Sequence, residues 1–308
     1  SLKASDAAGT KTLGGAVTVA GALTIDTGVT VAMGANTLVV TGASNIDGTL
    51  DVAGSTLTLT GASAVGGAIT ISTGTVDANG TFDATGGAVT FTGAGNLQLA
   101  GVVASLGALT DSDFGTVTYD ANGDQAIVSD DYVNLIAGGG AGTKTLAGVV
   151  TVAGGFTIDT GVTTAMGANN LTVTGATTIP GTVTITTATL DADGTFDATG
   201  GTIDINGEGN LLLAGATPLL GTNLSTDFGK VTYDGTAQTI FADTYYSLTA
   251  GGGAGTKSLL GAVTCADAFT VDADVTVDMD GNTIGVTGAT DINGILTVGG
   301  STLTLDGA

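Results

Sequence analysis

AGGGAGTKTLAGVVTV, residues Ala137–Val152, is the stretch that indicates the fold, because it recurs. It returns as AGGGAGTKSLLGAVTC at Ala250–Cys265 and, in reduced form, as SDAAGTKTLGGAVTV at Ser5–Val19. Each copy begins a long series of short segments, which are separated by Gly, Asn-Gly or Asp-Gly. A chain of 308 residues would ordinarily suggest two globular domains, but repetition of this kind indicates a repeat architecture instead.

Within each short segment, apolar residues alternate with Thr or another small residue. A spacing of two is the period of a β-strand, and the spacing typical of a helix is absent. The pattern therefore predicts many short strands joined by turns. The apolar pairs of the first part of the chain are Val17/Val19, Leu23/Ile25, Val29/Val31, Leu38/Val40, Leu50/Val52, Leu57/Leu59 and Ile69/Ile71.

Two longer periods are present. Leu38–Ser44 (LVVTGAS) returns after one short unit as Leu57–Ser63 (LTLTGAS), whereas Lys11, Lys144 and Lys257 mark a much longer period. The second interval between these lysines is shorter than the first by about one short unit, yet the flanking pattern stays in phase. A solenoid tolerates such a loss because each coil contacts only its neighbours, whereas a barrel or sandwich would lose its strand register.

These periods predict an all-β fold, a parallel β-helix (β-solenoid) with three strands in each coil of about 19–22 residues. A right-handed coil is expected from the usual preference of parallel crossovers. We expect one continuous solenoid over residues 1–308, with long repeats at approximately 8–140, 141–253 and, in part, 254–308.

Two stretches depart from the simple pattern. Asp113–Leu135 and Asp227–Leu248 contain all five tyrosines and three of the eight phenylalanines, and Gln125 corresponds to Gln238. We expect these large side chains to fill the core of a wider coil, or of a module packed outside the solenoid. An aromatic binding platform is the alternative.

The lysine of the GTK motif occurs once in each long repeat, at Lys11, Lys144 and Lys257. The expected role is a solvated or locally paired lysine. A covalent cross-link from the lysine to Asn or Asp is the alternative interpretation.

Composition restricts the function. The formal net charge is −23, and the chain contains no His and no Arg. Nucleic acids and anionic lipid surfaces require basic patches, so neither is an expected partner, and every apolar run is too short for a membrane-spanning helix. The usual general bases and oxyanion-binding side chains are also absent, which favours a protein that is not an enzyme.

Acidic clusters suggest a metal. Asp77-x-Asn79-Gly-x-x-Asp83 recurs as Asp191-x-Asp193-Gly-x-x-Asp197, and a further cluster contains Asp278 and Asp280. Oxygen ligands at alternate positions beside a Gly turn are suited to Ca²⁺, although the full EF-hand pattern is missing. The alternative is that Asp-Gly and Asn-Gly only form turns. No cofactor is required on either interpretation. The eight residues of the calcium hypothesis are Asp77, Asn79, Asp83, Asp191, Asp193, Asp197, Asp278 and Asp280.

The order of segments resembles the large secreted β-strand-repeat proteins of bacteria, which include parallel β-helical adhesins, autotransporter-like passengers and surface fibres. The residues that carry this resemblance are TYDGTAQTI at Thr232–Ile240, TYYSL at Thr244–Leu248, GAGTKSL at Gly253–Leu259 and LTVTG at Leu171–Gly175. The resemblance covers nearly the whole chain and implies a secreted β-helix at the cell surface, without implying a catalytic residue.

Both ends of the chain are ordinary coil sequence. Ser1–Leu13 aligns with Ser247–Leu259, and Ser301–Ala308 aligns with Ser55–Ala62. We therefore expect either that further repeats of the same polypeptide follow or that identical subunits stack head to tail. The expected function is a structural component of an extracellular filament, fibre or surface layer, and the alternative is the stalk of a cell-surface adhesin.

Overall fold

The computed structural model describes residues 1–5, 8–110, 114–221, 224 and 228–307, which form strands and turns without a helix. Asp113 and Asp227, where the two aromatic stretches begin, and Ala308, the last residue of the expected solenoid, lie outside the described residues. Across the described ranges, nothing has the length and apolarity of a membrane-crossing helix. The chain divides into two compact units, Ser1–Ala147 (unit 1) and Gly148–Ala308 (unit 2).

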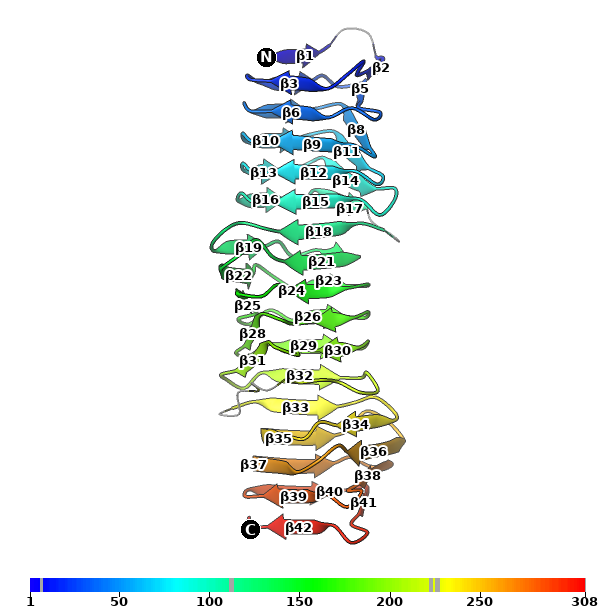
Figure 1. Cartoon of the computed structure of the whole chain (residues 1–308), viewed down its shortest axis with the longest axis vertical. Coiled ribbons are helices and arrows are strands. Elements are labelled where there is room, and N and C mark those ends of the chain that lie inside the picture. The colour runs from blue at the N-terminus through cyan, green and yellow to red at the C-terminus, as the bar shows by residue number, and fades with distance from the viewer. Residues whose placement is uncertain (6–7, 111–113, 222–223, 225–227, 308) are drawn as a thin grey trace. The chain divides into compact units, whose positions relative to one another are not determined.

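Unit 1 is built from short strands that pair in parallel, and Figure 1 shows them stacked layer upon layer. One sheet contains β1 (Leu2–Ala4), β4 (Leu23–Ile25), β7 (Ser44–Ile46), β10 (Ser63–Val65), β13 (Phe82–Asp83) and β16 (Val103–Ser105). A second contains β2 (Gly9–Thr12), β5 (Val29–Ala32), β8 (Thr49–Ala53), β11 (Ala68–Ile71), β14 (Ala88–Phe91) and β17 (Ala108–Thr110). The third sheet includes β3 (Val17–Val19), β6 (Leu38–Val40), β9 (Thr56–Leu59), β12 (Thr75–Ala78), β15 (Asn96–Leu99), β18 (Thr116–Tyr119) and β21 (Asn134–Ala137). The remaining strands of unit 1 are β19 (Gln125–Ile127), β20 (Asp131–Tyr132) and β22 (Gly142–Leu146).

Unit 2 repeats this arrangement. Its longest series of neighbouring strands is β23 (Val150–Val152), β26 (Leu171–Val173), β29 (Thr189–Ala192), β32 (Asn210–Leu213), β33 (Lys230–Tyr233), β35 (Thr244–Ala250), β37 (Val263–Val271), β39 (Thr283–Val286) and β42 (Thr302–Leu305), with β40 (Ala289–Ile292) paired to β37. Two further series are β24 (Phe156–Ile158), β27 (Thr177–Thr178) and β30 (Phe196–Asp197), and β25 (Val162–Ala165), β28 (Thr182–Ile185) and β31 (Thr202–Ile205). A fourth is β34 (Gln238–Ile240), β36 (Gly255–Leu259), β38 (Val275–Asp278) and β41 (Ile295–Thr297).

Strand register explains the core. Leu38 pairs with Leu57, and Leu57 pairs with Val76, so each partner occupies the equivalent position of the next coil. All three side chains are fully buried, because alternation along each strand keeps the same positions inward in every coil. The structure confirms the predicted all-β fold, a parallel β-solenoid with three strands in each coil and about 15 turns over the described residues.

Glycine occupies a corner where successive coils come very close. A Cβ atom built on Gly80 would overlap the backbone of Gly61, and one built on Gly101 would overlap the backbone of Gly80. A side chain at these positions would therefore push neighbouring coils apart. The high Gly content of the sequence follows in part from this close approach.

The aromatic coils are shorter than their neighbours, not wider. Thr116 pairs with Asn134, and Lys230 pairs with Ser247, and both intervals along the chain are shorter than those of the regular coils described above. The expectation of a wider or external module was therefore wrong. The expectation of core filling is confirmed, because four of the five tyrosines are buried: Tyr119, Tyr132, Tyr233 and Tyr245.

Deletion of a whole coil tests the modular packing. Removal of Leu38–Thr56, which is one complete coil, should leave unit 1 folded, because Leu57 then takes the place of Leu38 beside Val17. Far-UV circular dichroism and thermal melting should show a retained β-sheet signal. Removal of only Leu38–Asp47 is the control, and it should abolish the cooperative transition of unit 1 because turn residues then meet strands. Loss of the sheet signal in the whole-coil deletion would contradict the modular packing.

Candidate functional site

The candidate site is a buried network of Tyr, Gln and Lys side chains, and its first element is a pair of tyrosines in unit 1. Tyr119, at the end of β18, and Tyr132, in β20, have hydroxyl oxygens 2.9 Å apart, and their rings meet edge to face. Tyr132 donates its hydroxyl proton to the carbonyl of Val128 at 2.7 Å, so Tyr119 must donate to Tyr132. The amide of Val128 in turn donates to the Tyr119 hydroxyl at 3.1 Å. The pair therefore closes the following turn from inside.

Unit 2 contains the same pair. The hydroxyls of Tyr233 and Tyr245 are 2.8 Å apart, Tyr245 donates to the Phe241 carbonyl, and the Phe241 amide donates to Tyr233. Burial raises the pKa of Tyr119 to about 12 and raises the pKa values of Tyr233 and Tyr245 as well. All of these hydroxyls are thus neutral hydrogen-bonding groups at physiological pH.

A buried glutamine connects the tyrosine-bearing coil to the coil before it. The side-chain amide of Gln125 donates to the carbonyls of Leu99 and Gly101, at 2.6 and 2.8 Å. Its side-chain oxygen accepts a hydrogen bond of 3.2 Å from the amide of Ala121. Gln125 therefore ties a turn of its own coil to the end of β15.

A buried lysine then connects the same coil to the coil after it. Lys144 pairs with Gln125 across β19 and β22, and its side chain is 0% exposed. Its ammonium donates to the carbonyls of Ala121 and Gly123, at 2.7 and 3.0 Å, and to the side-chain oxygen of Gln125 at 3.3 Å. Three acceptors thus match the three protons of the ammonium group.

A network of the same kind recurs in unit 2. Gln238 donates to the carbonyls of Leu213 and Gly215, at 2.6 and 2.8 Å, and accepts from the amide of Gly235. Lys257, also 0% exposed, donates to the Gly235 carbonyl and to the side-chain oxygen of Gln238. We call Thr116–Tyr132 and Lys230–Tyr245 the Tyr–Gln coils.

The expected solvated state was wrong for two of the three copies, because Lys144 and Lys257 are buried, whereas the expected local pairing is found in both as hydrogen bonds to nearby oxygens. Burial lowers the pKa of Lys144, while the nearby carboxylates of Asp120 and Asp124 act in the opposite direction. The sequence does contain a signal for this site. In each unit the glutamine precedes the lysine by the same interval, which is the length of one regular coil.

The structure separates the residues of the first acidic cluster. Asp77 lies on β12 and Asp83 on β13, strands that belong to two different sheets. Asn79 donates to the Asp77 carboxylate at 2.9 Å, and the Asp83 carboxylate accepts from the Thr85 amide at 2.9 Å. Both carboxylates therefore stabilise local turns.

The other two clusters follow the same pattern. Asp191 lies on β29 and Asp197 on β30, again in different sheets, and the Asp197 carboxylate accepts from the amide two residues on. Asp193 is an exposed residue of the turn between these two strands. Asp278, at the end of β38, accepts from the amide of Asp280 at 3.1 Å. Within the described ranges, no three or more acidic, Cys or His side chains are grouped so that they could hold a metal ion.

Acidic side chains instead approach one another between coils. Burial, followed by the nearby charge of Asp77, raises the pKa of Asp120. Burial and the charge of Asp193 likewise raise the pKa of Asp234 in unit 2. One carboxylate oxygen of Asp120 and one of Asp234 are buried without a hydrogen-bond partner among the described residues. Both observations favour protonation of these two carboxyl groups on mild acidification.

Comparisons with protein-family models, with curated proteins and with solved structures gave no significant match to this chain.

The buried lysine can be tested by substitution. Lys144→Met keeps much of the aliphatic stem but leaves the carbonyls of Ala121 and Gly123 without their donor, and we expect the free energy of unfolding to fall by about 2 kcal/mol. Lys3→Met is the control, since the Lys3 side chain is 60% exposed and forms a surface ion pair with Asp26, and it should change stability by less than about 1 kcal/mol. Urea denaturation measures both, and equal stability of Lys144→Met and the parent chain would contradict the assigned role.

Mild acid should stabilise the protein. A folded-state pKa above the ordinary value of 3.8 means that folded Asp120 binds more protons than unfolded Asp120 just above that pH. Stability from this group is therefore lost as pH rises through that window. The melting temperature should rise as pH falls from ~7 towards ~4, and the rise should be smaller in Asp120→Asn.

Asp83→Asn is the matched control for this experiment, because hydrogen bonds from Thr85 lower the pKa of Asp83. The stabilisation from ionised Asp83 is lost only as pH falls below its ordinary pKa of 3.8, so Asp83→Asn should leave the rise between pH ~7 and ~4 nearly unchanged. A rise that is unchanged in Asp120→Asn at constant ionic strength would contradict the assignment.

Calcium binding at the acidic clusters stays a prediction. If it occurs, Ca²⁺ should raise the melting temperature or promote association more than Mg²⁺ at equal ionic strength, and the double variant Asp191→Asn/Asp193→Asn should reduce the difference. Identical melting curves with Ca²⁺, Mg²⁺ and chelator would contradict the hypothesis. An equal rise with every salt would indicate only screening of the acidic surface.

Proposed function

We propose that this protein is a structural, non-enzymatic component of an extracellular filament, fibre or surface layer, built by end-to-end stacking of β-solenoid coils. The observation that carries the proposal is the Tyr, Gln and Lys network. In both units the Gln and Lys side chains are turned inward and bonded to neighbouring coils, and the tyrosine hydroxyls close a turn of their own coil. These polar groups thus serve the packing of the coils.

The extracellular assignment rests on the resemblance to secreted bacterial β-strand-repeat proteins. Acidic composition supports it, because a strongly negative surface keeps a stacked apolar core soluble. The proposed partners are identical subunits stacked head to tail or further repeats of the same polypeptide. Neither nucleic acid nor membrane insertion forms part of this function.

Electron microscopy of surface material from the producing organism tests the proposal. Antibodies raised against the chain should label fibres or a surface layer at regular intervals along their length. The same serum absorbed with purified chain is the control. Label confined to stems that carry a separate terminal domain would favour the adhesin stalk, and label confined to the cell interior would contradict both assignments.

A further inference from the structure

The first copy of the GTK motif, at Lys11, differs from the other two copies in the exposure of its lysine. Lys11 lies on β2, the last strand of its sheet, and its side chain is exposed. Towards the following coil its register matches that of Lys257, because Lys11 pairs with Val31 as Lys257 pairs with Val277. Among the described residues, the strand that carries Gln238 beside Lys257 has no counterpart beside β2.

Glycine at the start of the motif gives a second indication. A Cβ atom on Gly142 would overlap the backbone of Gly123, and one on Gly255 would overlap the backbone of Thr236. Gly9 has a φ of 140°, the same as Gly142, yet nothing lies within 4 Å of the place where its Cβ would be. The space that the Gly123 and Thr236 backbones occupy beside Gly142 and Gly255 is therefore open beside Gly9 among the described residues.

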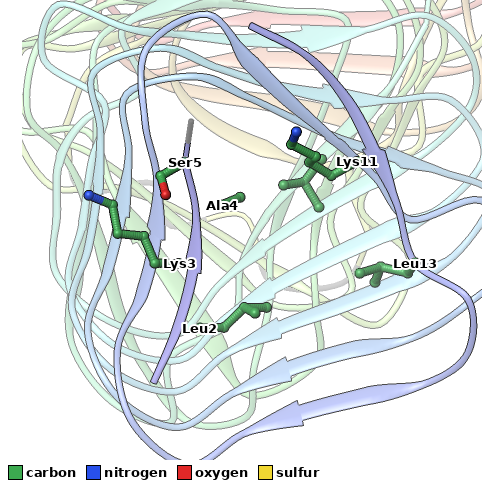
Figure 2. Close-up of a pocket in the computed structure, with 7 residues that line it drawn as sticks. Leu2, Lys3, Ala4, Ser5, Lys11 and Leu13 are labelled. Carbon is green, nitrogen blue, oxygen red and sulfur yellow. The ribbon is translucent and has the colours of Figure 1, made fainter. Parts of the chain in front are cut away.

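Apolar side chains beside Lys11 are also partly uncovered. Leu2 and Leu13 are half-buried, whereas their counterparts Leu248 and Leu259 are buried. Leu2, Ala4 and Leu13 help to line a hollow of about 300 Å³. Figure 2 shows these side chains around it, with Lys3 and Lys11 on opposite sides. We call this surface the Lys11 face; its lining residues are Leu2, Lys3, Ala4, Ser5, Lys11, Leu13 and Val31.

We propose that the Lys11 face is a docking surface for a Tyr–Gln coil, a β-solenoid coil of the pattern found at Lys230–Tyr245. Its Gln oxygen and a turn carbonyl accept hydrogen bonds from the Lys11 ammonium, as Gln238 and Gly235 do for Lys257. Its strands pair in parallel with β1 and β2 and cover the apolar hollow. The exposed cation is thereby matched to oxygen acceptors as it is buried.

The column of Lys257 also shows which kind of coil does not suit the Lys11 face. At the edge of the described part of unit 2, Val277 pairs with Leu296 on β41, so Leu296 stands in the column of Lys257. A coil edge of that kind has no side-chain oxygen there and would leave the Lys11 ammonium without the acceptor that Gln238 supplies to Lys257. The inference deepens the proposed function by naming the partner coil, and it rests on that function only in taking coil addition as the mode of assembly.

Extension of the full chain tests the inference without any fibre. One variant carries an added copy of Phe228–Tyr246 before Ser1, in phase with the natural junction at Ser247, and a second carries Gly115–Val133 instead. Acetylation of the lysines with a small amine-reactive acyl donor, followed by mass spectrometry, gives the reactivity of Lys11 relative to that of exposed Lys3. In both variants we expect Lys11 to react at least about tenfold more slowly than in the unextended chain, together with a higher melting temperature.

The matched control is the first extension with Gln238→Leu made in the added copy only, which should lose much of the protection of Lys11. Unchanged Lys11 reactivity in both extended chains, or failure of both added segments to increase the β-sheet signal, would overturn the proposal. Protection of Lys11 that appears in the unextended chain as its concentration rises would assign the face to a second copy and also overturn it. Absence of fibres on cells would contradict the proposed function alone.

Discussion

Parallel hydrogen bonding between strands one coil apart is the constraint on which the rest of the structure depends. It requires each residue to lie over its counterpart in the next coil, as Leu57 lies between Leu38 and Val76. Inward positions must then be apolar in every coil, and corners such as Gly80 must lack a side chain. A single register thus determines the alternation of the sequence, the placement of its glycines and its tolerance of whole-coil deletions.

The buried polar network is the exception to the apolar core. A buried ammonium or amide is costly unless its partners are in place, so a coil displaced by one residue would leave Lys144 and Gln125 without the carbonyls that they now bind. An apolar column alone penalises such displacement less, because one aliphatic side chain can replace another. We interpret the network as a device that fixes the register where the coils are short.

Charge on the outside follows a different principle. The carboxylates of Asp83 and Asp197 accept hydrogen bonds from nearby turn amides. The hydrogen bonds from Thr85 lower the pKa of Asp83 and so favour its ionised form. Asp120 and Asp234, in contrast, lie partly buried next to other carboxylates from neighbouring coils. Stacking therefore brings like charges together, and the fold limits this cost by leaving more than half of the described acidic residues exposed to solvent.

The sequence by itself determined the fold class, the coil length and the inward positions, because each depends on a period that can be read along the chain. It also contained the one-coil spacing between Gln125 and Lys144 that identifies them as neighbours in adjacent coils. Only the tertiary structure decided that Lys144 is buried while Lys11 is exposed, and that Asp77 and Asp83 belong to different sheets. The reason is physical. The burial of a side chain depends on atoms from the coils on both sides of it, and these atoms belong to residues outside its local sequence.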